Sequence, residues 1–138
     1  MKNNFITLIL IKIIYIFRLN LKPQMENIAL LSQLIVSISV IIVWIFRYDN
    51  IVIEFKQYKL SDLLRNIVGA AKISLATMLI LGIWYKELLI GSSLAMAFLM
   101  VCAQLAHVKV KNPWPKYVPS FILLVLSLFI AAFNYGLV

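Results

Sequence analysis

The sequence contains one cysteine, one histidine and five acidic side chains among 138 residues, against thirteen lysines and arginines. A single cysteine, Cys102, cannot form an internal disulfide, which excludes a dithiol oxidoreductase that works without a partner's thiol. One histidine, one cysteine and scattered acids match no known metal-ligand spacing, so we predict no metal site. The sequence also lacks a phosphate-binding loop, a nucleophile elbow and a paired-histidine motif, and this favours a protein that is not an enzyme.

Charged residues are scarce, at 13%, whereas 64% of the residues are hydrophobic. Soluble domains average ~25% charged and ~45–50% apolar residues, so the bilayer is the expected solvent of this chain. A spanning helix needs about 20 apolar residues, and the length therefore accommodates four spans in one domain. We predict an all-α, integral membrane four-helix bundle, multi-pass in the cell (plasma or inner) membrane. The predicted spans cover about residues 28–46, 67–85, 88–106 and 119–135.

Residues 1–24 lack Ala, Gly, Val, Asp and Glu, all of which occur in the rest of the chain. No small-x-small cleavage site follows the apolar run from Phe5 to Ile11, which argues against a cleaved signal peptide. An uncleaved anchor or surface helix is one alternative. The other, which we favour, is that translation begins at Met25. Residues 1–24 would then be an N-terminal extension outside the mature protein, and residues 25–138 the transmembrane domain.

Basic residues cluster in the first and third connections between the predicted spans, which lie on the same side of the membrane. These connections and their borders hold Arg47, Lys56, Lys59, Arg65, Lys109, Lys111 and Lys116. The opposite side has Lys86 alone if the chain begins at Met25. The positive-inside rule then places the long connections in the cytoplasm and both termini outside. If residues 1–24 belong to the protein, Lys2, Lys12, Arg18 and Lys22 weaken this asymmetry when they do not cross the membrane, and a fifth span would move the N-terminus inside. Basic residues between apolar runs also indicate contact with lipid head groups rather than with nucleic acid.

Several local signals refine the helices. Ser61 before Asp62 predicts an N-cap that starts the second spanning helix. Trp44 and Tyr48 are predicted to be interfacial aromatics at the end of the first span. Small and polar side chains recur at helical spacing and predict faces that pack against neighbouring helices. On the third span these are Ser93, Ala97, Met100, Gln104 and His107, and on the fourth Ser120, Leu124, Ser127, Ala131 and Asn134.

Four polar side chains are predicted to gather at the basic side as a candidate polar pocket: Glu54, Lys72, Gln104 and His107. Lys72 is the sharpest of them, because an ionisable group inside a membrane is costly and marks a site by default. Glu54 is the best candidate to offset its charge, and Asp62 the next. The alternative for Lys72 is that its side chain reaches back to the nearer surface. For His107 the alternatives are a structural hydrogen bond, a proton relay and an anchor for a head group.

The region from Met25 to Gly136 resembles the DoxX-like family of small four-helix membrane proteins. The residues that carry the resemblance are Glu54-Phe55 with Tyr58 and Leu60, Leu64-Arg65, Val68-Gly69, and the connection from His107 to Pro115. The family pattern has proline where Ser61 stands, and many relatives carry an acid in place of Lys72, so that acid's role does not transfer. The resemblance implies a four-helix bundle whose relatives accompany quinone-linked or thiol-linked redox systems, often as accessory subunits.

Three functions are compatible with these features. The first is a non-enzymatic accessory or assembly subunit of a membrane complex, which is redox-linked if the resemblance holds. The second is a binding module for a quinone or lipid, with the four candidate residues at the polar end of an apolar pocket. The third is a small oligomeric transporter. No cofactor is evident from the residues, and quinone enters by family resemblance only. The expected partners are the lipid bilayer, a membrane redox complex or further copies of the chain.

Overall fold

The computed structural model describes residues 2–138, with the side chains of residues 8–17 and 19–138. Over this range the fold is all-helical and contains five α-helices and one 3-10 turn. The helices are α1 (Lys2–Phe46), α2 (Tyr48–Gln57), α3 (Asp62–Leu81), α4 (Glu87–Lys109) and α5 (Val118–Tyr135), with the 3-10 turn η1 (Trp114–Lys116) before α5. Helices α1, α3, α4 and α5 are each long and apolar enough to cross a membrane.

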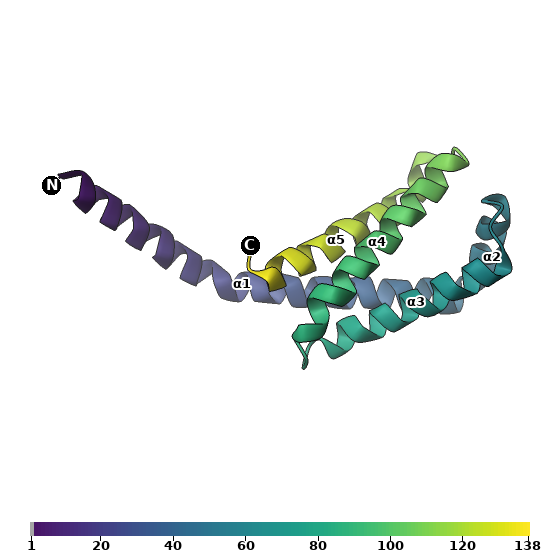
Figure 1. Ribbon diagram of the computed structural model, residues 1–138, viewed down its shortest axis with the longest axis horizontal. Coiled ribbons are helices and arrows are strands. Elements are labelled where there is room, and N and C mark those ends of the chain that lie inside the picture. Colours follow the sequence, from purple (N-terminus) through teal and green to yellow (C-terminus); the bar gives the residue numbers. More distant parts are fainter. Residues whose placement is uncertain (1) are drawn as a thin grey trace.

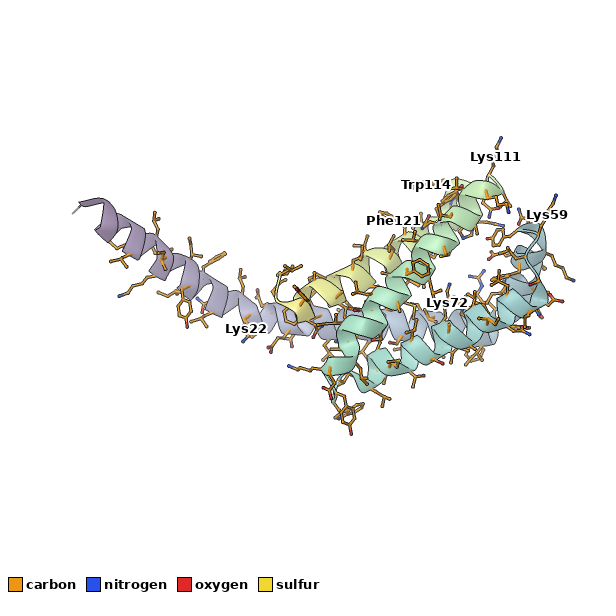
Figure 2. The ribbon with its side chains drawn as sticks, viewed as in Figure 1. Lys22, Lys59, Lys72, Lys111, Trp114 and Phe121 are labelled. Carbon is orange, nitrogen blue, oxygen red and sulfur yellow. The ribbon has the colours of Figure 1, made fainter. Side chains whose placement is uncertain are left out.

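The four long helices form two pairs, α1 with α3 and α4 with α5 (Figure 1). The pairs come together near the turn between α3 and α4, which we call the turn end (residues 82–86). They diverge toward α2 and η1, which we call the basic end. Figure 2 shows Lys59 and Lys111 together at the basic end, with Lys72 further along α3. The predicted basic connections therefore do lie at one end of the bundle.

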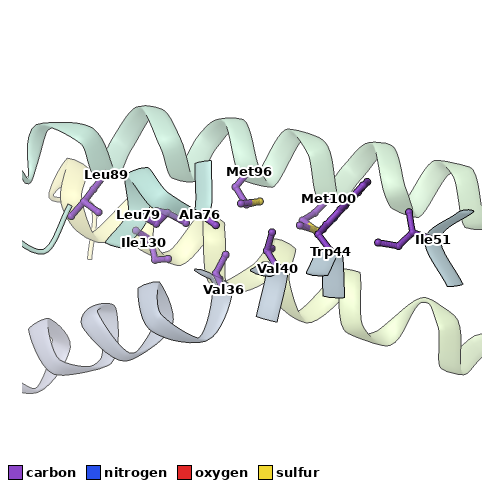
Figure 3. Packing of buried hydrophobic residues seen from close by; sticks show 10 residues of the cluster. All are labelled: Val36, Val40, Trp44, Ile51, Ala76, Leu79, Leu89, Met96, Met100 and Ile130. Carbon is purple, nitrogen blue, oxygen red and sulfur yellow. The ribbon is translucent and has the colours of Figure 1, made fainter. Parts of the chain in front are cut away.

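The core joins both pairs through a row of buried apolar side chains (Figure 3). Its members are Val36, Val40, Trp44, Ile51, Ala76, Leu79, Leu89, Met96, Met100 and Ile130. Buried serines continue this packing toward the turn end. Ser92 and Ser93 donate to the carbonyl oxygens of Leu88 and Leu89, one turn earlier, so their hydroxyls are satisfied within α4. On the predicted faces of the third and fourth spans, Ser93, Ala97, Met100, His107, Ser127 and Ala131 are buried, and Gln104, Ser120, Leu124 and Asn134 are half-buried.

Helix α1 runs without a break for 45 residues and contains Pro23. Its first half projects beyond the other helices (Figure 1) and exposes apolar side chains such as Leu10, Ile14 and Phe17. At ~1.5 Å rise per residue the helix is about 68 Å long, more than twice the ~30 Å hydrocarbon core of a bilayer. The boundary predicted at Met25 lies inside this helix, and a mature start at Met25 stays a prediction.

The predicted count of four helices is one short, because α2 forms inside the first connection. Arg47 leaves helical geometry, with φ −114° and ψ 27°, and separates α2 from α1. Ile51, Phe55 and Tyr58, spaced four and three residues apart, give α2 an inward face that packs on the bundle. This spacing is the signal that would have revealed the helix. Tertiary packing then holds a ten-residue segment that would be only marginally helical alone.

Helix α3 begins as predicted and ends earlier than predicted. The Ser61 hydroxyl accepts a hydrogen bond from the Leu64 N–H at 3.2 Å, which confirms the N-cap. The predicted span continued to Tyr85, but the helix ends at Leu81. Gly82 then lies directly against the Leu89 side chain, which fills the space that a Cβ at residue 82 would need. The close contact between the end of α3 and the start of α4 depends on that glycine.

Candidate functional site

A cavity of about 620 Å³ lies between the two helix pairs at the basic end. Helices α1, α2 and α3 supply one wall, and α4, η1 and α5 supply the other. Small-molecule pockets usually measure ~300–1,000 Å³, so this cavity has the size of a ligand site. Most of the wall is apolar, and it includes Val40, Val43, Ile51, Phe55, Leu64, Val68, Leu99, Met100, Ala103, Ala106 and Leu123.

Charged side chains in the cavity wall are mostly cationic. Arg47, Lys72 and Lys116 line it, and Glu54 is the single carboxylate among the lining residues. Within the described part of the chain, one ion pair occurs within 4.0 Å, and it joins Arg65 to Asp62 on α3. The cavity cations are therefore not neutralised by direct contact with a carboxylate among these residues.

Trp44 sits beneath Lys72 because α1 and α3 approach closely at Gly69. A Cβ added at Gly69 would lie 2.5 Å from Cζ3 of the indole, so the ring occupies the place of the missing side chain. Phe55 packs on the same indole edge to face, with ring centroids 6.3 Å apart. Trp44 is buried against the bundle, with 8% of it exposed. Its predicted depth at the membrane interface stays a prediction.

The Lys72 ammonium lies 5.8 Å from the centroid of the Trp44 ring, over its face. A cation at this distance is attracted by the negative face of the indole, by ~0.5–2 kcal/mol depending on desolvation. Lys72 forms no ion pair with Glu54, and its side chain lines the cavity. That Lys72 reaches back to the nearer membrane surface stays a prediction. The indole stabilises the ammonium without consuming its hydrogen-bond donors.

His107 is the centre of a buried hydrogen-bond network at the same end. Its Nδ1 lies 2.9 Å from the Tyr58 hydroxyl and 2.8 Å from Nδ2 of Asn112. Gln57 Nε2 donates to Asn112 Oδ1 at 3.1 Å, and the Tyr117 hydroxyl donates to the His107 carbonyl at 3.2 Å. The network ties α2, the end of α4 and the segment before α5 together.

The C-terminal turn of α4 places Asn112 against His107. Lys111 adopts a left-handed conformation with φ 52°, and the Asn112 N–H then bonds to the His107 carbonyl at 3.1 Å. This is the bonding pattern of a Schellman turn, which reverses the chain at a helix end. The same pattern ends α2, where Lys59 has φ 55° and the Leu60 N–H bonds to the Phe55 carbonyl.

Tyr58 follows α2 and is buried. Burial, followed by the nearby Glu54 carboxylate, raises the pKa of Tyr58 to about 12, while the hydrogen bond from Asn112 acts in the opposite direction. The phenol therefore keeps its proton at physiological pH. It can donate that proton to Nδ1 of His107.

The structure brings three of the four predicted pocket residues together. Glu54, Lys72 and His107 all line the cavity. Gln104 is not among the lining residues: its Nε2 donates to the Tyr117 carbonyl at 2.9 Å and to the Ser120 hydroxyl at 2.8 Å, which joins α4 to α5. Sequence reasoning missed Asn112, for which no local signal exists. Tyr58 stood among the family-like positions, and its helical spacing from Ile51 was the available clue.

The fold and the cavity together define a small all-α protein with four helices able to cross a membrane and a partly open apolar pocket with a polar end. The chain belongs to the DoxX-like family, whose family model matches residues 29–130. Membership of this family and the four apolar helices indicate that the chain is a small membrane protein. Searches of curated proteins and of solved structures gave no match. Among the described side chains, no group of three or more His, Cys, Asp or Glu could hold a metal ion.

Proposed function

We propose that the chain is a multi-pass integral protein of the cell (plasma or inner) membrane, with its basic end in the cytoplasm. The proposal is supported by seven basic residues in or beside the connections at that end, against Lys86 alone on the other side if the chain begins at Met25. Four helices crossing as a bundle would place α2 and η1 at the cytoplasmic surface.

Cysteine labelling in intact cells tests this orientation. In a Cys102→Ser background, an impermeant maleimide should label Lys86→Cys and spare Lys111→Cys, and both side chains are exposed in the structure. Labelling of Lys111→Cys before cell lysis would show that the basic end faces outward.

We further infer that the protein is a non-enzymatic binding module for an amphiphilic small molecule of the lipid or quinone class. The observation that carries this is the 620 Å³ cavity, which is apolar over most of its wall and polar at the basic end. An apolar body with a few polar groups in place is the usual composition of a small-molecule site. Such a ligand would enter from the bilayer with its head toward the basic end.

The test is extraction of small molecules from protein purified in a mild neutral detergent. Ala103→Phe fills the cavity, because Ala103 is half-buried in its wall. Ala95→Phe is the matched control, since Ala95 is half-buried on the same helix and lies outside the lining. We expect a specific lipid or quinone in the wild type and in the control, and at least a tenfold loss in Ala103→Phe. Equal content in all three proteins, folded to the same extent, would contradict the proposal.

The accessory and transporter roles predicted from the sequence stay predictions. The same preparation addresses the first, because a redox enzyme retained stoichiometrically with the chain would identify an accessory subunit. Binding of an amphiphile is compatible with that role, as a subunit of this kind would carry the ligand for its partner.

A further inference from the structure

We propose that the cavity takes an anionic amphiphile, and that His107 donates a hydrogen bond from Nε2 to an oxygen of its head group. This rests on the proposed function and specifies its ligand: an apolar chain ending in a carboxylate or a phosphate ester. The hydrogen-bond partners of His107 and the charge of the wall are independent observations that lead to the same head-group chemistry.

The charge of the wall favours an anion. Arg47, Lys72 and Lys116 outnumber Glu54 by three to one among the lining residues. None of the three is in an ion pair within the described structure. Arg47 and Lys116 are exposed, so the cost of an unneutralised charge falls on Lys72, which is half-buried, and an anionic head would relieve that cost. Lys72 keeps all its N–H donors available, because its neighbour is the face of the Trp44 ring.

The network around His107 decides which ring nitrogen carries the proton. The amide Nδ2 of Asn112 can only donate, and it lies 2.8 Å from Nδ1. Its orientation is set by Gln57, which donates to Asn112 Oδ1. The Tyr58 hydroxyl is a second donor to Nδ1. A proton on Nδ1 would point at the Asn112 amide hydrogens, so Nδ1 accepts and the neutral ring carries its proton on Nε2.

Nε2 is the ring atom left to meet a ligand. Both hydrogen bonds of the ring are made by Nδ1. In the described structure, the fully enclosed side-chain nitrogen and oxygen atoms without a hydrogen-bond partner are Ser37 Oγ, Arg65 Nε and Ser127 Oγ. Nε2 of His107 is not among them. Since His107 lines the cavity, we assign Nε2–H to that space. It would therefore bind an acceptor oxygen, as the Lys72 ammonium would.

Fluorescence gives the binding test. Trp84→Phe and Trp114→Phe remove two exposed indoles and leave Trp44, which lines the cavity, as the single reporter. A fatty acid brominated along its chain should quench Trp44 in neutral detergent. We expect the acid to bind at least tenfold more tightly than its methyl ester. Displacement by an unbrominated fatty acid and by a monoalkyl phosphate then ranks the two head groups.

Two lysine variants distinguish binding of the carboxylate by Lys72 from a general attraction between the acid and the basic protein. Lys72→Met should weaken binding of the acid about tenfold and leave the ester unchanged. Lys109→Met is the matched control, because Lys109 is an exposed cation outside the lining, and it should change neither. Equal affinity for acid and ester would overturn the inference and leave amphiphile binding intact. If neither compound quenches Trp44, the proposed function itself fails.

The tautomer has its own readout. His107 is the only histidine, so ¹⁵N-histidine labelling gives the spectrum of one ring. We expect the Nε2–H tautomer, and a shift of the Nε2 signal when the fatty acid is added. A ring protonated on Nδ1, or an Nε2 signal that does not respond to a bound acid, would overturn the role of His107.

Discussion

The two ends of the bundle are built differently, although the same four helices form both. At the turn end, Leu79 and Ile130 are fully buried, and Leu89 covers Gly82 (Figure 3). At the basic end, the helix pairs enclose a 620 Å³ cavity. We therefore expect stability to reside mainly at the turn end and, under the proposed function, binding to occur at the basic end.

Truncating one leucine at each end, the buried Leu79 and the half-buried Leu99, should show this difference most strongly. Leu79→Ala should lower the free energy of unfolding by about 2 kcal/mol. This is the low part of the range for buried leucines, because lipid or detergent also solvates the side chain of the unfolded state. Leu99→Ala, at the cavity wall, should cost less than half as much. Thermal unfolding in one detergent measures both, and equal losses would contradict the assignment of stability to the turn end.

Glycine substitutions sharpen the same comparison. Gly82→Val should destabilise by ~1–3 kcal/mol, because the new side chain collides with Leu89. Gly91→Ala is the control, since nothing lies within 4 Å of a Cβ there. Alanine is also the better helix former, so Gly91→Ala should be neutral or slightly stabilising. A stabilising Gly82→Val would mean that the turn end is not closely packed.

At the basic end, Tyr58 should make stability depend on alkaline pH. Its pKa is raised from 10.0 to about 12, so the protonated phenol is favoured by folding. The stability that this contributes is complete below pH 10 and is lost as pH rises through about 12. Tyr58→Phe should unfold at a lower temperature at neutral pH and lack this component of the alkaline loss. If the melting temperatures of the wild type and of Tyr58→Phe fall by the same amount between pH 10 and about 12, Tyr58 is not the titrating group.

The smallest effect is expected for the pair Glu54 and Lys72. The structure forms no ion pair between them, and Lys72 lies over Trp44 instead. A double-mutant cycle with Glu54→Gln and Lys72→Met should therefore give a coupling energy below ~1 kcal/mol. Coupling of several kcal/mol would mean that the two charges neutralise each other in the membrane, as the sequence had suggested.

Local pattern accounted for most of the helical architecture. The Ser61 N-cap, the buried faces of α4 and α5 and the single basic end follow from spacing and charge alone. Helix α2 was missed because it has only ten residues and half of them are polar or charged. A helix this short is stable only when it packs on the bundle. Of the four predicted site residues, Glu54, Lys72 and His107 line one cavity and Gln104 lies outside its lining. That they form a binding site stays a prediction.

The sequence by itself determined the class of protein, the number of long apolar helices and the end at which charge collects. These depend on composition and on a helical period, which act over a few residues. Only the tertiary structure decided that Gly69 admits the Trp44 ring beneath Lys72, and that Asn112 and Tyr58 meet at one nitrogen of His107. Tyr58 and His107 are 49 residues apart, so their contact depends on where the helix pairs diverge. That divergence follows from side-chain volumes on all the facing helices at once, which no local pattern contains.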